Sequence, residues 1–242
     1  MSDKPILFSA PMVRALLEGR KTQTRRVLKP QPSEWTARII DISTPYFCDD
    51  HQAWGQMETI WSSPSWDSPM GEPMREEWHP LPLRFAIGVR LWVREAWRVD
   101  RRHDHEPPRD VDTKTVWYEA DGEVCGAGIV LGRYRHARFM PRWASRLTLT
   151  VTNVRVERLQ DISEEDAWAE GIWRVDGFTH RDGTDHADWS WQDEDCDFDL
   201  NGTDARDGYS KLWDHINGAG AWEENPWVVA VSFSVALKNI DR

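Results

Sequence analysis

Residues 9–26 read SAPMVRALLEGRKTQTRR, and this segment sets the expected start of the fold. Ser9 can cap a helix, Pro11 suits a first helical turn, and apolar residues follow at helical spacing until Gly19. A short apolar run, residues 6–8, precedes the segment. We therefore predict the order strand, helix over residues 10–18, loop and strand for the first thirty residues.

The polar end of this segment can carry chemistry. After Gly19 it offers a lysine, two hydroxyl groups and three guanidinium groups, from Lys21, Thr22, Thr24, Arg20, Arg25 and Arg26. Neighbouring guanidiniums disfavour an ammonium, so we expect a lowered pKa for Lys21, which can then act as a base for the Thr24 hydroxyl. Strand alternation would separate these two side chains, so they cooperate only if Lys21 belongs to the turn. The alternative interpretation is an exposed arginine-rich edge that only solvates the fold.

Charge is unevenly distributed along the 242 residues. The formal net charge of -11 argues against indiscriminate binding to nucleic acid, because that mode needs net basic character. Residues 1–30 nevertheless hold seven Lys and Arg against two Asp and Glu, whereas residues 163–207 hold three Arg against fifteen Asp and Glu. We interpret this as a basic site at one end of the fold and a solvated acidic segment at another. A scatter of charge without function is the alternative.

The cellular location follows from features that the sequence lacks. No apolar run is long enough to span a membrane, and the first residues do not resemble a secretory signal. Cys48, Cys125 and Cys196 fit no disulfide framework, which favours a reducing compartment. His180 and His186 with Cys196 match no known metal-ligand spacing. We therefore predict a soluble cytoplasmic protein with no membrane contact, no metal and no cofactor.

Further strands and helices are expected in the second half of the chain. The longest β-like segment, residues 141–158, changes the parity of its apolar residues near Asn153, which predicts a bulge. Ser163 begins a capping box, so a helix should run to about Glu170 and end at Gly171. Other expected elements are strands within residues 83–99 and 115–120, a helix near 209–216 and a closing strand over 227–237.

Three segments show little periodicity and are interpreted as insertions: residues 29–80, 98–135 and 173–207. Within the first of them only a short strand at residues 38–42 is expected. Most of the sixteen tryptophans should be packing residues, although one beside the basic segment can stack on a base.

The pattern Gly-x-Lys-x-x-x-x-Arg, filled by Gly19, Lys21 and Arg26, resembles the signature of the ASCH family in the PUA-like superfamily. Residues 91–97, 140–172 and 225–227 also resemble, in the same order, a longer branch of that family encoded by phages and prophages. The resemblance implies an α+β fold: a small PUA-like β-barrel with flanking helices and long loop insertions, in a single domain over residues 1–242. For a phage-encoded protein the predicted location is the host cytoplasm.

Small bacterial ASCH proteins remove the acetyl group from N4-acetylcytidine with a lysine base, a threonine nucleophile and a glutamate proton donor. By resemblance these catalytic roles fall on Lys21, Thr24 and Glu170. Substrate binding is expected of Gly19, Arg20, Arg25 and Arg26, in and beside the motif, and Arg26 is the candidate donor to an oxyanion.

Three hypotheses follow for the function. The first is an amidohydrolase acting on RNA or a modified nucleoside, which requires a closed pocket that joins Lys21, Thr24 and Glu170. The second is a non-catalytic module that binds RNA or a modified base in an open basic groove. The third is a phage protein that binds a host protein through its acidic, Trp-rich insertions.

Overall fold

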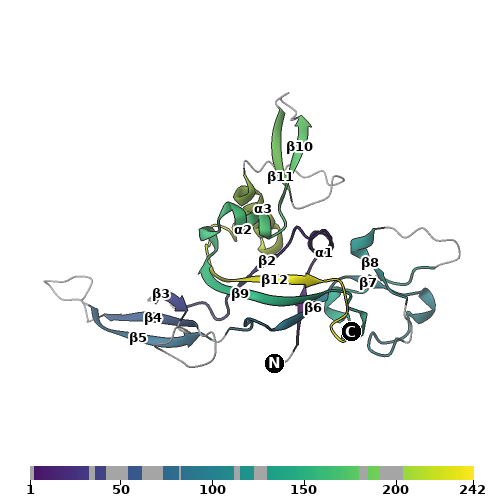
Figure 1. Cartoon of the computed structure of the whole chain (residues 1–242), viewed down its shortest axis with the longest axis horizontal. Helices are drawn as coiled ribbons and strands as arrows, with labels where there is room; N and C mark the ends of the chain where they lie inside the picture. Colours follow the sequence, from purple (N-terminus) through teal and green to yellow (C-terminus); the bar gives the residue numbers. More distant parts are fainter. Residues whose placement is uncertain are drawn as a thin grey trace.

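A computed structural model describes residues 3–32, 36–41, 54–61, 73–81, 83–111, 115–122, 130–179, 185–190 and 204–242. Its centre is a five-stranded sheet in the order β1, β6, β9, β12, β2 (Figure 1). These strands are β1 (Lys4–Leu7), β6 (Arg90–Arg94), β9 (Thr148–Arg158), β12 (Trp227–Ala236) and β2 (Gln23–Val27). The helices are α1 (Ala10–Leu17), α2 (Glu164–Ala169) and α3 (Ala205–Asn217), so the predicted α+β class is confirmed.

The central sheet is mostly antiparallel, and only β1 and β6 run parallel. The ladder between β9 and β12 changes register because Asn153 pairs with Ser232 while Val151 pairs with Phe233, which leaves Thr152 as an extra residue. This confirms the bulge predicted near Asn153. A bulge increases local twist and bends a strand, so the long strands β9 and β12 can curve.

The edge strands β1 and β2 approach each other without pairing. Among the described strands no backbone ladder joins them, so the sheet is open and a closed barrel is not formed. A side chain bridges the gap instead, because Arg26 of β2 donates a 2.7 Å hydrogen bond from Nη2 to the carbonyl of Leu7 in β1.

The main hydrophobic core lies between this sheet and the three helices. Helix α1 contributes Val13 and Leu16, α2 contributes Ala167, and α3 contributes Leu212. Figure 1 shows α2 and α3 side by side at one end of the sheet. Each expected helix is confirmed, although α3 begins four residues before the predicted start at Tyr209. No helix in the described ranges is both long and apolar enough to cross a bilayer.

The predicted insertions contain more strands than the sequence analysis expected, although the strand expected at residues 38–42 overlaps β3. The first holds a separate antiparallel sheet of β3 (Thr36–Asp41), β4 (Trp54–Trp61) and β5 (Pro73–Leu81), and the third holds a hairpin of β10 (Trp173–Thr179) and β11 (Asp185–Ser190) (Figure 1). Gly, Pro and charged residues within these segments weaken the period-two hydrophobic signal. Cys48, Cys125, Cys196 and His180 lie outside the described residues.

A second, small core is shared by the second insertion and the residues on either side of it. Strands β7 (Trp97–Arg98) and β8 (Trp117–Tyr118) pair there, and the buried side chains belong to Trp97, Val99, Val111, Met140 and Ala144. The connections that the structure describes contain five short 3-10 helices, over Arg101–His103, Glu119–Asp121, Ala137–Phe139, Arg142–Ala144 and Leu159–Asp161.

An ion pair between a buried carboxylate and a partly exposed arginine lies where this small core meets the central sheet. Glu95, 1% exposed, follows β6 and accepts hydrogen bonds of 2.9 and 3.0 Å from Arg146. Arg146 also reaches Asp121 and lies 4.0 Å above the ring of Tyr118. A buried carboxylate is tolerated only when it is paired, so Arg146 holds the two parts of the fold together.

Replacing this arginine tests the assignment. Arg146→Met leaves the Glu95 carboxylate buried and unpaired, so we expect a loss of about 3–5 kcal/mol in the free energy of unfolding, measured by urea denaturation. The matched control is Arg98→Met, whose pair with Glu119 is partly exposed on both sides and should contribute about 0–1 kcal/mol. Equal losses in the two variants would contradict the assignment.

Candidate functional site

Lys21 belongs to the turn that ends α1 and not to strand β2. Gly19 has a φ of +76°, its N–H donates to the carbonyl of Leu16, and the N–H of Lys21 donates to the carbonyl of Ala15. A glycine in the left-handed region is a common helix end because no Cβ opposes it. The condition for cooperation between Lys21 and Thr24 is therefore met.

The lysine is buried against the end of α2. Lys21 Nζ donates 2.7 Å hydrogen bonds to both the carboxylate Oε2 and the backbone carbonyl of Glu170. The two side chains are 2% and 4% exposed. An edge of the fold that merely solvates it would leave these groups in water, so that interpretation is wrong for Lys21.

Gly171 makes this close approach sterically feasible. It follows Glu170 with a φ of +98°, and a Cβ at this position would lie 3.1 Å from the Cβ of Ala15 and 3.3 Å from the Cβ of Lys21. Any side chain would therefore push α1 and the lysine turn away from α2. A further backbone bond, from Thr22 N–H to the carbonyl of Ala169, fixes the two segments together.

Arg25 contacts the second carboxylate oxygen of Glu170, the one that Lys21 does not contact. Its guanidinium donates to Glu170 Oε1 at 3.2 Å, to Glu157 at 2.7 Å and to Asp166 at 2.8 Å, and its side chain is fully buried. Substrate binding was expected of Arg25. Its N–H groups instead face three protein carboxylates and the amide oxygen of Gln23. The structure gives it a positioning role.

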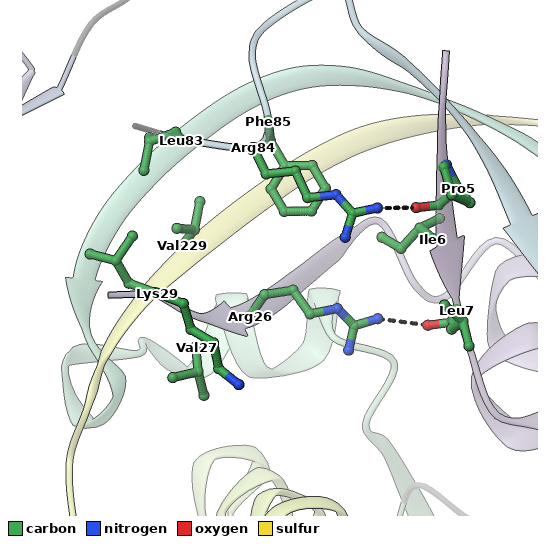
Figure 2. A pocket seen from close by; sticks show the side chains of 11 residues that line it. Pro5, Ile6, Leu7, Arg26, Val27, Lys29, Leu83, Arg84, Phe85 and Val229 are labelled. Carbon is green, nitrogen blue, oxygen red and sulfur yellow. Dashed lines mark hydrogen bonds between the residues drawn. The ribbon is translucent and has the colours of Figure 1, made fainter. Parts of the chain in front are cut away.

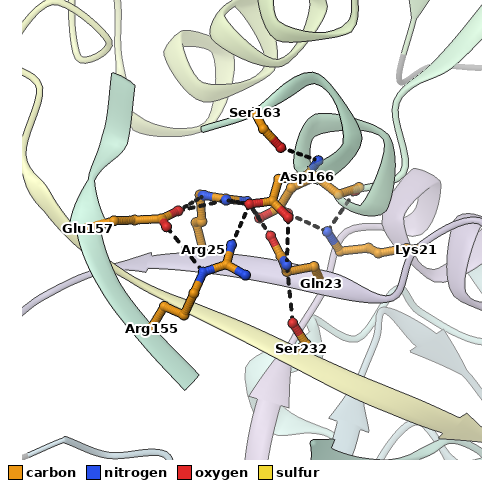
Figure 3. Close-up of polar contacts among 9 residues, drawn as sticks. Lys21, Gln23, Arg25, Arg155, Glu157, Ser163, Asp166 and Ser232 are labelled. Atoms are coloured by element: carbon orange, nitrogen blue, oxygen red, sulfur yellow. Dashed lines mark hydrogen bonds and ion pairs between the residues drawn. The ribbon is translucent and has the colours of Figure 1, made fainter. Parts of the chain in front are cut away.

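The ion pair is one part of a larger polar network, which Figure 3 shows. Arg155 pairs with both Glu157 and Asp166, and Gln23 donates to Asp166 and Ser232 at 3.1 Å. Three basic and three acidic side chains are thus balanced in this network: Lys21, Arg25, Arg155, Glu157, Asp166 and Glu170.

The pKa of Lys21 is shifted in the direction expected from the sequence, but burial is the largest cause. Loss of water lowers the pKa of the ammonium below its ordinary value, the Glu170 carboxylate partly opposes this shift, and the positive charges of Arg26 and Arg25 add to it. Burial also raises the pKa of Tyr209, and the charge of Glu170 acts in the same direction.

A small cavity joins the three predicted catalytic residues. Its lining includes Lys21, Thr24, Glu170 and Arg26, and its volume is about 70 Å³. Such a volume holds a few water molecules at roughly 10–15 Å³ each, and is well below the about 300 Å³ of a typical ligand pocket. The cavity is therefore large enough for a small functional group and too small for a nucleoside.

The opposite wall of this cavity comes from α3, which sequence reasoning did not assign to the site. Tyr209, Leu212, Trp213 and Ile216 line it at helical spacing. The indole N–H of Trp213 is buried without a partner among the described residues. The sequence predicts a helix here. That this helix lines the cavity is visible only in the folded structure.

The other predicted binding residues are arranged differently. Arg26 lines the cavity and lies 5.2 Å above the ring of Phe8. Arg20 faces away from it, donates to Glu18 and to the carbonyl of Gly171, and lies 4.1 Å above the ring of Trp173. Gly19 ends helix α1 and begins the turn that carries Lys21. The site therefore brings together Lys21, Thr24, Arg26 and Glu170.

No protein-family model, no curated protein and no solved structure matches this chain. A metal-binding cluster of three or more His, Cys, Asp or Glu is also absent, as far as the described residues extend. The chemistry of the site therefore has to be argued from its own geometry.

The energetic coupling between Lys21 and Glu170 can be measured directly. Lys21→Met leaves the Glu170 carboxylate in a buried site without its nearest cation, so the free energy of unfolding should fall by about 3–5 kcal/mol. Adding Glu170→Gln removes that charge, and the double variant should lose less than the sum of the two single losses, by about 0.5–3 kcal/mol.

Denaturant unfolding of the four proteins provides this double-mutant cycle. Arg20→Met is the matched control, because this neighbouring cation is partly exposed and pairs at the surface, where the contribution is about 0–1 kcal/mol. Additive losses for Lys21 and Glu170 would show that the contact does not couple them.

Proposed function

We propose that the chain is an ASCH-type protein of the PUA-like superfamily whose small cavity hydrolyses the amide of an N4-acylated cytidine. In this proposal residues 1–242 form one domain, and the open five-stranded sheet corresponds to the barrel. The observation that carries it is the meeting of Lys21, Thr24 and Glu170 at one cavity, with Nζ and the carboxylate 2.7 Å apart.

The ion pair supplies both the base and the acid that the reaction needs. Transfer of one proton from Lys21 Nζ to Glu170 over 2.7 Å gives a neutral amine and a carboxylic acid. Burial favours this neutral pair because it lowers the pKa of the Lys21 ammonium. Arg25 holds the Glu170 carboxyl group in place for the transfer, through a 3.2 Å contact with Oε1.

The reaction then proceeds through an acyl-enzyme. Neutral Lys21 takes the proton of Thr24 Oγ1, which attacks the amide carbonyl, and Glu170 protonates the departing exocyclic nitrogen as the C–N bond breaks. Water next attacks the threonine ester, with its proton passing to the Glu170 carboxylate. The Lys21 ammonium returns a proton to Thr24 as the ester C–O bond breaks, which restores the neutral pair.

Donors for the developing oxyanion are present around the cavity. The guanidinium of Arg26 lines it, and the indole N–H of Trp213 has no partner among the described residues. Preformed donors of this kind stabilise a tetrahedral intermediate more than they stabilise the planar amide. We assign this role to Arg26 first, with Trp213 as the second donor.

A non-catalytic module that recognises RNA or a modified base is the second candidate. The observation in its favour is that Lys21 and Glu170 are already paired within a balanced network, as buried ion pairs that only support a fold are. Binding would then fall to the cations outside the network. The hypothesis of a host-protein partner depends on the acidic segment, much of which lies outside the described residues.

Thr24 separates these candidates. Thr24→Val keeps a β-branched side chain of similar shape in strand β2, so folding should be unchanged while release of acetate from N4-acetylcytidine falls at least about 1,000-fold. Thr24→Ser retains a hydroxyl and should keep measurable turnover. No release of acetate by the wild-type protein would reject the amidohydrolase and favour the recognition module.

The pH dependence tests the shared proton. Above the lowered pKa of Lys21 the pair has lost the proton that the leaving nitrogen requires, so kcat/KM should fall as the pH rises, with a midpoint below the ordinary value of 10.5. Arg26 contributes to that lowering, so Arg26→Gln should move the midpoint to higher pH. A rate that rises and then stays level at high pH would mean that Lys21 acts as a simple base without a protonated Glu170.

A further inference from the structure

A larger pocket adjoins the small cavity, in the gap between β1 and β2. Its volume is about 400 Å³, within the range of roughly 300–1,000 Å³ that small-molecule sites occupy. The two hollows share Arg26 and Val27. A ligand in the larger pocket would therefore lie next to the proposed catalytic centre.

The lining of this pocket combines apolar walls with positive charge. Apolar surface comes from Ile6, Leu28, Leu83, Phe85 and Val229, and the charged lining residues are Arg26, Lys29 and Arg84. No Asp or Glu lines it within the described part of the chain. Such a pocket matches a ligand with a flat or apolar body and an anionic group.

The two guanidiniums are held in parallel by strand β1, as Figure 2 shows. Arg84 Nη2 donates to the carbonyl of Pro5 at 2.8 Å, and Arg26 Nη2 donates to the carbonyl of Leu7 at 2.7 Å. These bonds fix the orientation of each group, while its other N–H donors form no hydrogen bond with a described residue. Fixed guanidinium forks suit phosphate, which accepts such bonds in pairs.

The positive charges of Arg26 and Arg84 repel one another, and the Glu170 carboxylate only partly offsets this at Arg26. Burial lowers the pKa of Arg26, and the charge of Arg84 contributes to the lowering. Arg94, at the end of β6, has a lowered pKa for the same two reasons. Neither Arg26 nor Arg84 forms an ion pair with a described carboxylate. An anion bound here would remove this repulsion.

A peptide strand is a poor occupant of the same gap. Strand addition requires free carbonyl and N–H groups along an edge. The arginines already occupy the carbonyls of Pro5 and Leu7, which face the gap from β1. A small anionic ligand needs none of these groups.

We propose that the pocket between β1 and β2 binds the phosphate-bearing part of a nucleoside 5′-monophosphate, with Arg84 and Lys29 on the phosphate and the group to be cleaved directed past Arg26 into the small cavity. The orientation rests on the proposed function, whereas the preference for a phosphorylated over an uncharged nucleoside rests on the pocket. The phosphorylated form of the substrate would then be preferred over the free nucleoside.

Calorimetric titration of the intact protein tests this preference without turnover. The probes are the four common ribonucleosides, their 5′-monophosphates and inorganic phosphate. At least one monophosphate should bind about 10-fold or more tightly than its nucleoside, as one good charge-assisted contact provides. Arg84→Ala should abolish that difference, and Arg84→Lys should restore part of it.

Arg158→Ala is the matched control, because Arg158 also donates to a backbone carbonyl and lies over an aromatic ring, away from the pocket. Arg158→Ala should leave the difference in affinity between monophosphate and nucleoside unchanged. Equal binding of every nucleoside and its monophosphate would overturn the proposal, as would inorganic phosphate that binds as tightly as the nucleotides. Nucleotide binding without hydrolysis of N4-acetylcytidine or its 5′-monophosphate would reject only the amidohydrolase.

Discussion

The ammonium of Lys21 and the carboxylate of Glu170 lie 2.7 Å apart in a site with almost no exposure to water. Removing two charges from water costs several kcal/mol per ion, so the contact persists only because other groups complete it. Arg25 holds the second carboxylate oxygen and is itself held by Glu157 and Asp166. The ends of α1 and α2 and the start of β2 are therefore fixed relative to one another by electrostatics.

Local backbone geometry makes this arrangement attainable. A glycine in the left-handed conformation ends the helix on each side of the contact, Gly19 after α1 and Gly171 after α2. At Gly171 a Cβ would crowd Ala15 and Lys21, so the absence of that atom lets the lysine turn pack closely against the end of α2. The same turn brings Lys21 to the cavity that Thr24 also lines, and β2 carries Arg26 to the boundary between the two pockets.

The sequence predicted those parts of the fold whose signals are local. The helix after Ser9, the capped helix at Ser163 and the bulge near Asn153 all follow from neighbouring residues. Strands β4, β5, β10 and β11 were missed, because they pair in small sheets whose sequences lack strict alternation. The motif also pointed to Lys21 and Thr24, which line one cavity, yet it could not show that Arg25 faces carboxylates 132 to 145 positions away, or that α3 lines the same cavity. Contacts of that sequence separation leave no pattern within one segment.

The central claim is that the buried pair activates Thr24, and acid quenching during turnover of N4-acetylcytidine tests it most directly. Mass spectrometry of the quenched wild-type protein should find an acetyl group on Thr24, removable by hydroxylamine as an ester is. The adduct should form more slowly in Glu170→Gln and be absent from Thr24→Val. Steady release of acetate with no acetylated Thr24, or with a hydroxylamine-stable acetyl group on Lys21 instead, would contradict the account.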